Sequence, residues 1–260
     1  MPSFFDTELL LPVFIAIAMI MTRLVFLFLA MPSFGGSLLP RNILAAAVFV
    51  IAVAVYSGLP NIPYISFDPV TLIKAIFGEA VLGAAAGISA RIIFGAVETA
   101  GQVLGVPMGL GFAQAVDPLS NSQSVVTSQF LGIIVSLMFF ALDGHIILIR
   151  YIIESFKIMG PGEVVFSGDV GYVLASKGAL MFNAAIQLAA PVLVTLMGVM
   201  VSLGMLARIA PKVNLFVLSF AVSIGVGLFA LKAAIPNIVA FTRGLVLSIE
   251  PLVGDVLRNI

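Results

Sequence analysis

Long apolar runs separated by short stretches rich in glycine and proline dominate this chain. Uncharged runs extend over residues 42–67, 118–142 and 178–207. Each can supply the roughly 20 apolar residues that a membrane helix needs. The pattern predicts an all-α polytopic membrane protein with six long apolar helices. These are expected at 9–30, 43–56, 72–97, 130–151, 179–207 and 213–234.

Small residues and prolines refine these elements. The run Gly83-Ala-Ala-Ala-Gly87 in the third predicted helix has the small-xxx-small spacing of a close packing face. Pro191 predicts a kink in the fifth helix. After Pro236 we expect a last helical stretch up to Ile260, either on the surface or packed.

The composition agrees with a membrane protein and excludes several functional classes. Of the 260 residues, 62% are hydrophobic and 9% are charged, whereas soluble domains carry about 25% charged residues. Cysteine is absent and His145 is the one histidine, which excludes thiolate and multi-histidine metal sites. Basic and acidic residues balance at 12 each, so nothing indicates nucleic-acid binding. We predict neither a metal nor another cofactor.

Enzyme motifs are missing from the sequence. It contains no Gly-x-Ser-x-Gly elbow, no His-Glu-x-x-His pair and no phosphate-binding loop. Asp143 and His145 are more typical of a hydrogen-bonding pair at a helix end than of a catalytic base. A non-enzymatic role is therefore expected.

The segment 101–118 is too rich in glycine for an ordinary helix and too apolar for an ordinary loop. Gly101, Gly105 and Gly109 recur every four residues, a spacing that also favours simple close packing of helices. Pro107 interrupts the helical ladder, and irregular backbone at membrane depth must be buried or line a cavity. We predict a hydrophobic constriction with a movable loop. Its residues are Gly105, Pro107, Met108, Gly109, Leu110, Gly111 and Phe112.

Several charges interrupt the apolar runs. Intramembrane charges are costly and commonly functional, although pairing is an alternative. At about 1.5 Å per residue, Arg23 and Glu79 are expected at different depths, so a direct bond needs tilted or irregular helices. No compact ion site is therefore predicted. The residues expected to be buried or to act in assembly are Arg23, Glu79, Arg91, Asp117 and Asp143.

One motif set matches a known family. The run from Gly105 to Pro118, Gly-Val-Pro-Met-Gly-Leu-Gly-Phe-Ala-Gln-Ala-Val-Asp-Pro, resembles the FliR/SctT family of type III secretion export-gate proteins. Ser128-Gln-Phe130, Leu142-Asp-Gly-His145, Arg23 and Gly78-Glu79 extend the match over essentially the whole chain. The residues Gly-Gln-Val-Leu-Gly at 101–105 favour the flagellar branch.

The resemblance implies a place in the bacterial inner membrane, at the flagellar basal body. It implies assembly with FliP and FliQ, and contact with FlhB, into an entrance channel for unfolded export substrates. Residues 1–176 would resemble the FliP-type partner, and 177–260 a FliQ-type helical hairpin. The helices would be bent, with their charges facing partners or a wet channel, and the glycine segment would be a plug loop.

An alternative function is an ion-coupled secondary transporter whose helix is broken at Pro107. Such transporters show paired interrupted helices in two repeated halves, and the glycine segment has no second copy. On the export interpretation the isolated chain should be unstable. Its polar groups and its Gly83/Gly87 and Gly101/Gly105 faces would need partner proteins to bury against.

Overall fold

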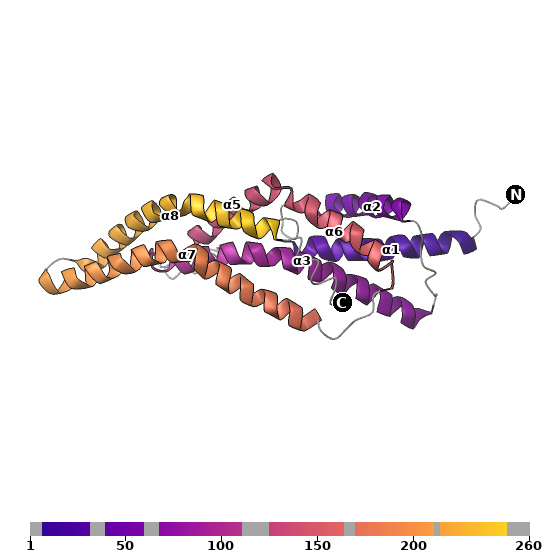
Figure 1. Ribbon diagram of the computed structural model, residues 1–260, viewed down its shortest axis with the longest axis horizontal. Helices are drawn as coiled ribbons and strands as arrows, with labels where there is room; N and C mark the ends of the chain where they lie inside the picture. Colours follow the sequence, from indigo (N-terminus) through magenta and orange to yellow (C-terminus); the bar gives the residue numbers. More distant parts are fainter. Residues whose placement is uncertain are drawn as a thin grey trace. The chain divides into compact units, whose positions relative to one another are not determined.

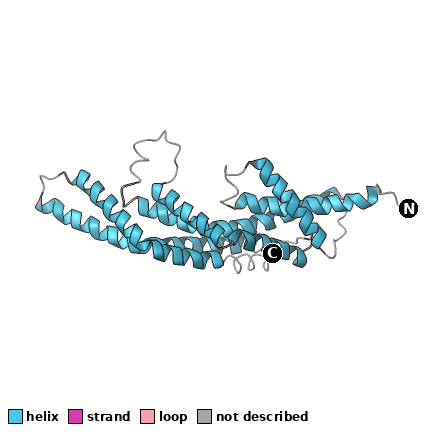
Figure 2. Ribbon diagram, turned by 90° about the horizontal axis from the view of Figure 1, so that it is seen from above, coloured by secondary structure: helices cyan, strands magenta, loops and turns pink. Residues whose placement is uncertain are grey.

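A computed structural model describes residues 7–31, 40–59, 68–110, 125–163, 170–210 and 214–248. Figures 1 and 2 show helices and no strand in this part of the chain, which confirms the all-α class. The helices are α1 (Thr7–Ala30), α2 (Arg41–Gly58), α3 (Pro69–Gly105), α5 (Val126–Ala141), α6 (Gly144–Ile158), α7 (Val170–Ile209) and α8 (Leu215–Leu247).

The sequence-based predictions of helix extent are wrong for the fourth apolar run and for the chain after Pro236. The fourth apolar run is not one helix, because α5 and α6 meet at an angle of 60°. Asp143 lies at this break with a left-handed φ of 56°, a conformation that ends an α-helical ladder. The separate helix expected after Pro236 does not exist up to Leu247, because α8 runs through that proline. Membrane-type helices tolerate proline where neighbouring groups satisfy the freed backbone.

Four helices in the described part are long and apolar enough to cross a membrane. They are α1, α3, α7 and α8, and the bent α5–α6 pair adds a fifth if it forms one span. α2 is a shorter apolar helix. The kink expected at Pro191, inside the unbroken helix α7, stays a prediction.

The chain divides into two compact units. Among the described residues, the first unit holds α1, α2, α6 and the part of α3 up to Ile92. Within it α1 packs on α2 and approaches α3 closely. A Cβ added at Gly83 would collide with the Arg23 carbonyl, and one at Gly87 would lie 2.6 Å from the Leu27 carbonyl oxygen. Gly83 and Gly87 thus permit the α1–α3 contact.

The second unit holds α3 from Ile93, together with α5, most of α7 from Gly178, and α8. Its core includes an edge-to-face contact between Phe94 and Phe139, with ring centroids 5.3 Å apart. The start of α5 lies against the end of α3. Thr127 donates a hydrogen bond to the Gly101 carbonyl at 2.6 Å, and Ser128 donates one to the Glu98 carbonyl at 2.9 Å.

The small-residue faces were wrongly expected to await partner proteins. A Cβ at Gly101 would lie 2.8 Å from the Ser128 nitrogen, and one at Gly105 would lie 2.8 Å from the Thr127 hydroxyl. Both pairs of glycines therefore bury against helices of their own chain. The physical reason is that this spacing specifies only close backbone approach, and a neighbouring helix of the same chain satisfies it.

Candidate functional site

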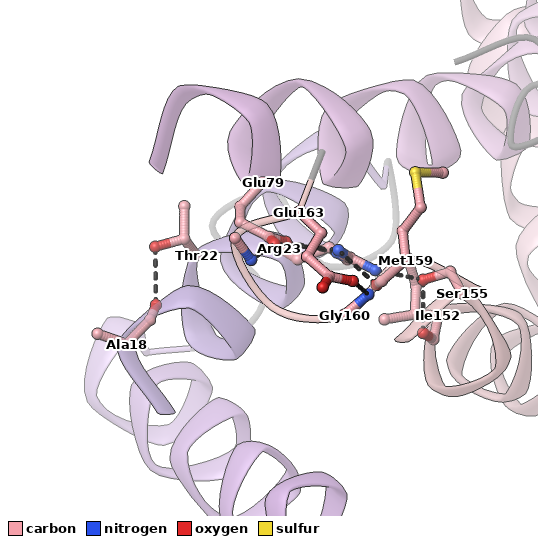
Figure 3. Close-up of polar contacts among 10 residues, drawn as sticks. Ala18, Thr22, Arg23, Glu79, Ile152, Ser155, Met159, Gly160 and Glu163 are labelled. Carbon is pink, nitrogen blue, oxygen red and sulfur yellow. Dashed lines mark hydrogen bonds and ion pairs between the residues drawn. The ribbon is translucent and has the colours of Figure 1, made fainter. Parts of the chain in front are cut away.

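Arg23 lies at the centre of a buried polar cluster formed by α1, α3 and α6 (Figure 3). Its Nε donates to Glu79 Oε2 at 2.5 Å, and its Nη2 donates to Glu79 Oε1 at 3.0 Å. Neither side chain has any exposed surface. This two-pronged pairing matches the planar guanidinium to the carboxylate, the strongest geometry for such an ion pair.

The rest of the Arg23 guanidinium group also makes contacts. Nη1 donates to the Ser155 hydroxyl at 2.7 Å, and Ser155 in turn donates to the Ile152 carbonyl at 2.7 Å. The Phe156 ring centroid lies 3.8 Å from the Arg23 guanidinium carbon, close enough for a cation–π contact. A charge taken out of water thus has partners on every side, which is the condition for burying it.

The cluster also fixes the chain segment that follows α6. The Gly162 N–H donates to Glu79 Oε1 at 2.8 Å, and Gly162 has a φ of 84°. The Glu163 N–H donates to the Gly160 carbonyl at 3.1 Å. Proline followed by a glycine with positive φ across this bond is the pattern of a type II turn. The ion pair therefore joins α1, α3 and the turn after α6.

A direct Arg23–Glu79 bond, which the depth argument expected only with tilted or irregular helices, does form. The depth argument treated the helices as independent straight spans, whereas α1 and α3 cross closely at Gly83. Glu79 precedes Gly83 by four residues and lies on the same helix face. On that face, Gly83 contacts the Arg23 backbone and Glu79 pairs with the Arg23 side chain. The spacing of Glu79 and Gly83 was the available signal.

The predicted constriction begins with a helix end. Helix α3 ends at Gly105, but the Met108 N–H still donates to the Leu104 carbonyl at 3.2 Å. The Gly109 N–H then donates to Val106 at 3.0 Å and the Leu110 N–H to Gly105 at 3.0 Å. With Gly109 at a φ of 81°, this pair of bonds is a Schellman motif. The 106–110 turn is thus an ordered, hydrogen-bonded cap.

Side chains attach this turn to α8. Met108 has no exposed surface, and a Cβ at Gly227 would lie 2.6 Å from its Cγ. Gly109 lies on the Phe220 ring, where an added Cβ would be 2.7 Å from Cδ1. A cavity of about 260 Å³ adjoins the turn, lined also by Met200 and Leu203 of α7 and by Ser219, Phe220 and Ser223 of α8.

The remaining residues of the predicted gate and assembly sites lie outside these two buried contacts. Pro107 and Leu110 are half-buried, while Arg91 and Asp143 are exposed, so their expected burial does not occur within this chain. Gly105 packs against α5, which favours the packing alternative at that position. Gly111, Phe112 and Asp117 lie outside the described residues. The gating and assembly roles stay predictions.

Sequence reasoning missed several residues that complete these sites. Gly160-Pro161-Gly162 is a recognisable turn signature, so Gly162 could have been found. Ser155, Phe156, Phe220 and Gly227 carry no signal of their own, because each is defined by a contact with a distant segment.

Comparison with known proteins identifies the family of this chain. The family model described as "Bacterial export proteins, family 1" matches residues 14–249, nearly the whole chain. The chain belongs to this family. The Arg23–Glu79 pair and the 106–110 turn both lie inside the matched region.

Curated relatives agree with this membership. The chain is 29% identical to flagellar biosynthetic protein FliR of Escherichia coli strain K12, over 85% of this chain and 84% of that protein. It is 30% identical to FliR of Pectobacterium carotovorum, over 82% and 80% respectively. It is 28% identical to FliR of Bacillus subtilis strain 168, over 96% of each chain. The chain is thus a membrane-embedded component of the flagellar protein export apparatus.

Proposed function

We propose that this chain forms part of the entrance channel through which unfolded flagellar subunits cross the bacterial inner membrane at the flagellar basal body. In this proposal it assembles with FliP and FliQ and adjoins FlhB. The segment that begins at the 106–110 turn acts as the gate. The role is non-enzymatic, in keeping with a sequence that lacks the nucleophile, metal and phosphate-binding motifs of enzymes.

The observation that carries this proposal is the apolar turn at the end of α3. It follows the 37-residue helix α3 inside an apolar bundle, where irregular backbone is tolerated only if protein buries it or it lines a cavity. Its buried Met108 packs on α8, and a cavity adjoins the turn. A hydrophobic constriction of this kind excludes ions by dewetting. Family membership favours export over a solute transporter broken at Pro107.

Deleting residues 108–112 from the chain in the full complex tests the gate. We expect the complex to assemble and to conduct small ions, because the apolar bulk of the constriction is gone. Co-purification of the partners measures assembly, and planar-bilayer recording of the purified complex measures conductance. Gly225→Ala on α8 is the control, because a Cβ there meets no atom within 4 Å; this variant should stay closed.

Two results would contradict the gate. An assembled deletion complex that stays closed would show that the segment does not seal the channel. A deletion that abolishes assembly without any leak would show that the segment serves packing alone. Either result would move the seal to another part of the complex.

A further inference from the structure

The contact between Met108 and Gly227 is possible because glycine has no side chain. A Cβ built there would lie 2.6 Å from Met108 Cγ, 2.9 Å from Cε and 3.2 Å from Sδ. The Met108 side chain therefore lies directly across the α8 backbone. Met108 is fully buried although its neighbour Val106 is 71% exposed, so this one side chain fastens the turn.

A second contact lies on the same face of α8. Gly109 rests on the Phe220 ring, and Phe220 and Gly227 are seven residues apart, about two helical turns. Because the Schellman bonds make the 106–110 turn one rigid unit, Met108 and Gly109 must leave α8 together. Any displacement of the turn therefore requires the Met108 thioether to leave Gly227.

Beside these two contacts, the turn is not closely packed against the α7–α8 hairpin. Val106, Pro107 and Gly109 border the cavity of about 260 Å³ between the turn and the α7–α8 hairpin. A methionine side chain adapts to irregular space through its flexible torsions. Empty volume next to a flexible anchor allows the turn to move without forcing the helices apart.

We propose that Met108 and Gly227 form a latch, which holds the 106–110 turn on α8 while the channel is closed and must release for substrate to pass. The inference rests on the proposed gate function, because a latch has a purpose only if the turn moves. It adds α8 as the element that controls the gate.

A reversible cross-link tests the latch. The chain has no cysteine, so the pair Met108→Cys and Gly227→Cys introduces the two thiols alone. The built Cβ at Gly227 lies 2.6 Å from Met108 Cγ, and Cγ is one C–C bond of about 1.5 Å from Met108 Cβ. The two Cβ atoms are therefore at most about 4.1 Å apart, within reach of the roughly 3.5–4.5 Å that a disulfide spans between Cβ atoms. In cells carrying the full apparatus, the oxidised pair should assemble normally and reduce secretion of flagellar subunits at least about tenfold. A thiol reductant should restore secretion.

A control pair, Val106→Cys with Gly225→Cys, places one thiol at an exposed position and the other in open space. It should neither cross-link nor respond to reductant. If the cross-linked Met108–Gly227 pair secreted as fast as the same pair after treatment with the thiol reductant, the latch would be overturned. Failure of this pair to cross-link would also overturn it. If the cross-linking experiment contradicts the latch but the complex with residues 108–112 deleted conducts ions, the gate proposal still holds. A deletion complex that stays closed contradicts the gate itself, whatever the cross-link does.

Discussion

At the scale of single residues, Arg23 shows how a full charge is stabilised inside an apolar bundle. Its guanidinium reaches a carboxylate, a hydroxyl and an aromatic ring, and it has no exposed surface. A buried pair of this kind contributes little net stability when both members are present. Removing one member leaves an uncompensated charge, which costs about 3–5 kcal/mol. The pair therefore specifies how α1, α3 and α6 meet rather than adding a large stability term.

Arg23→Leu should reduce the yield of assembled complex and cell motility together. The reason is that, among the residues that the structure describes, the Gly162 N–H would be the remaining hydrogen-bond partner of the buried Glu79 charge. The double variant Arg23→Leu with Glu79→Leu should recover much of the yield, because both charges are then absent. Co-purification and swimming assays measure the two effects. Full yield of an inactive complex from the single variant would instead place Arg23 in the channel.

Asp143 is a second residue whose conformation matters more than its charge. It is exposed and has a φ of 56°, at the break between α5 and α6. Asp143→Gly and Asp143→Asn should keep complex yield and motility, because both residues adopt this conformation readily. Asp143→Val should lower the thermal stability of the complex, since a β-branched residue there costs roughly 1–2 kcal/mol or more. If Asn and Gly variants assembled fully but abolished motility, the carboxylate itself would have a function.

At the scale of helices, the apolar runs predicted approximately where α1, α2, α3, α7 and α8 lie, but they did not separate α5 from α6 and did not show how the helices end or bend. Helix α3 was expected to end at 97 and reaches Gly105, because the glycines that suggested a loop instead meet α5. Pro236 was expected to end a helix and does not. Pairwise contacts such as that between Met108 and Gly227 could not be predicted from the sequence, since they depend on which helices become neighbours. Local sequence patterns predict where helices form. Packing against neighbouring helices decides whether a glycine or proline ends a helix or continues it.

The α1–α3 contact gives a prediction for elements. Gly83→Ala should destabilise the complex, because the new Cβ would collide with the Arg23 backbone, which cannot move aside like a flexible side chain. Gly244→Ala in α8 is the matched control: its Cβ meets nothing within 4 Å, and alanine is favoured over glycine in helices by about 1 kcal/mol. Thermal melting of the two purified complexes should shift in opposite directions. Equal shifts would show that α1 and α3 do not rely on this close approach.

At the scale of the whole molecule, burial is very uneven among the apolar helices. Over its most apolar window α3 is 67% buried within the chain, whereas α7 is 33% buried and α8 is 22% buried. Lipid can cover apolar side chains, but α8 also exposes Lys232 and Arg243. These are eleven residues apart, about three turns, and so lie on one face. Lys232 lies at the centre of the apolar stretch Val217–Leu247, and a basic residue at the centre of a lipid-exposed helix costs about 2.5–3.5 kcal/mol. We therefore infer that protein or water covers this face.

This unevenness yields the last prediction. Expressed without FliP-type and FliQ-type partners, the chain should aggregate or be degraded, since α8 would face lipid with Lys232 and Arg243 uncovered. Co-expression of both partners should raise the amount of intact chain. Lys232→Leu with Arg243→Leu should raise the amount of the isolated chain, because lipid can cover a face of α8 that carries no charge. The same double variant should lower recovery of the chain in the complex, because a partner protein that contacts these two cations would lose that contact. Quantitative immunoblots and size-exclusion profiles in mild detergent separate these outcomes. A long-lived, monodisperse monomer of the unaltered chain would show that it needs no partner to cover α8.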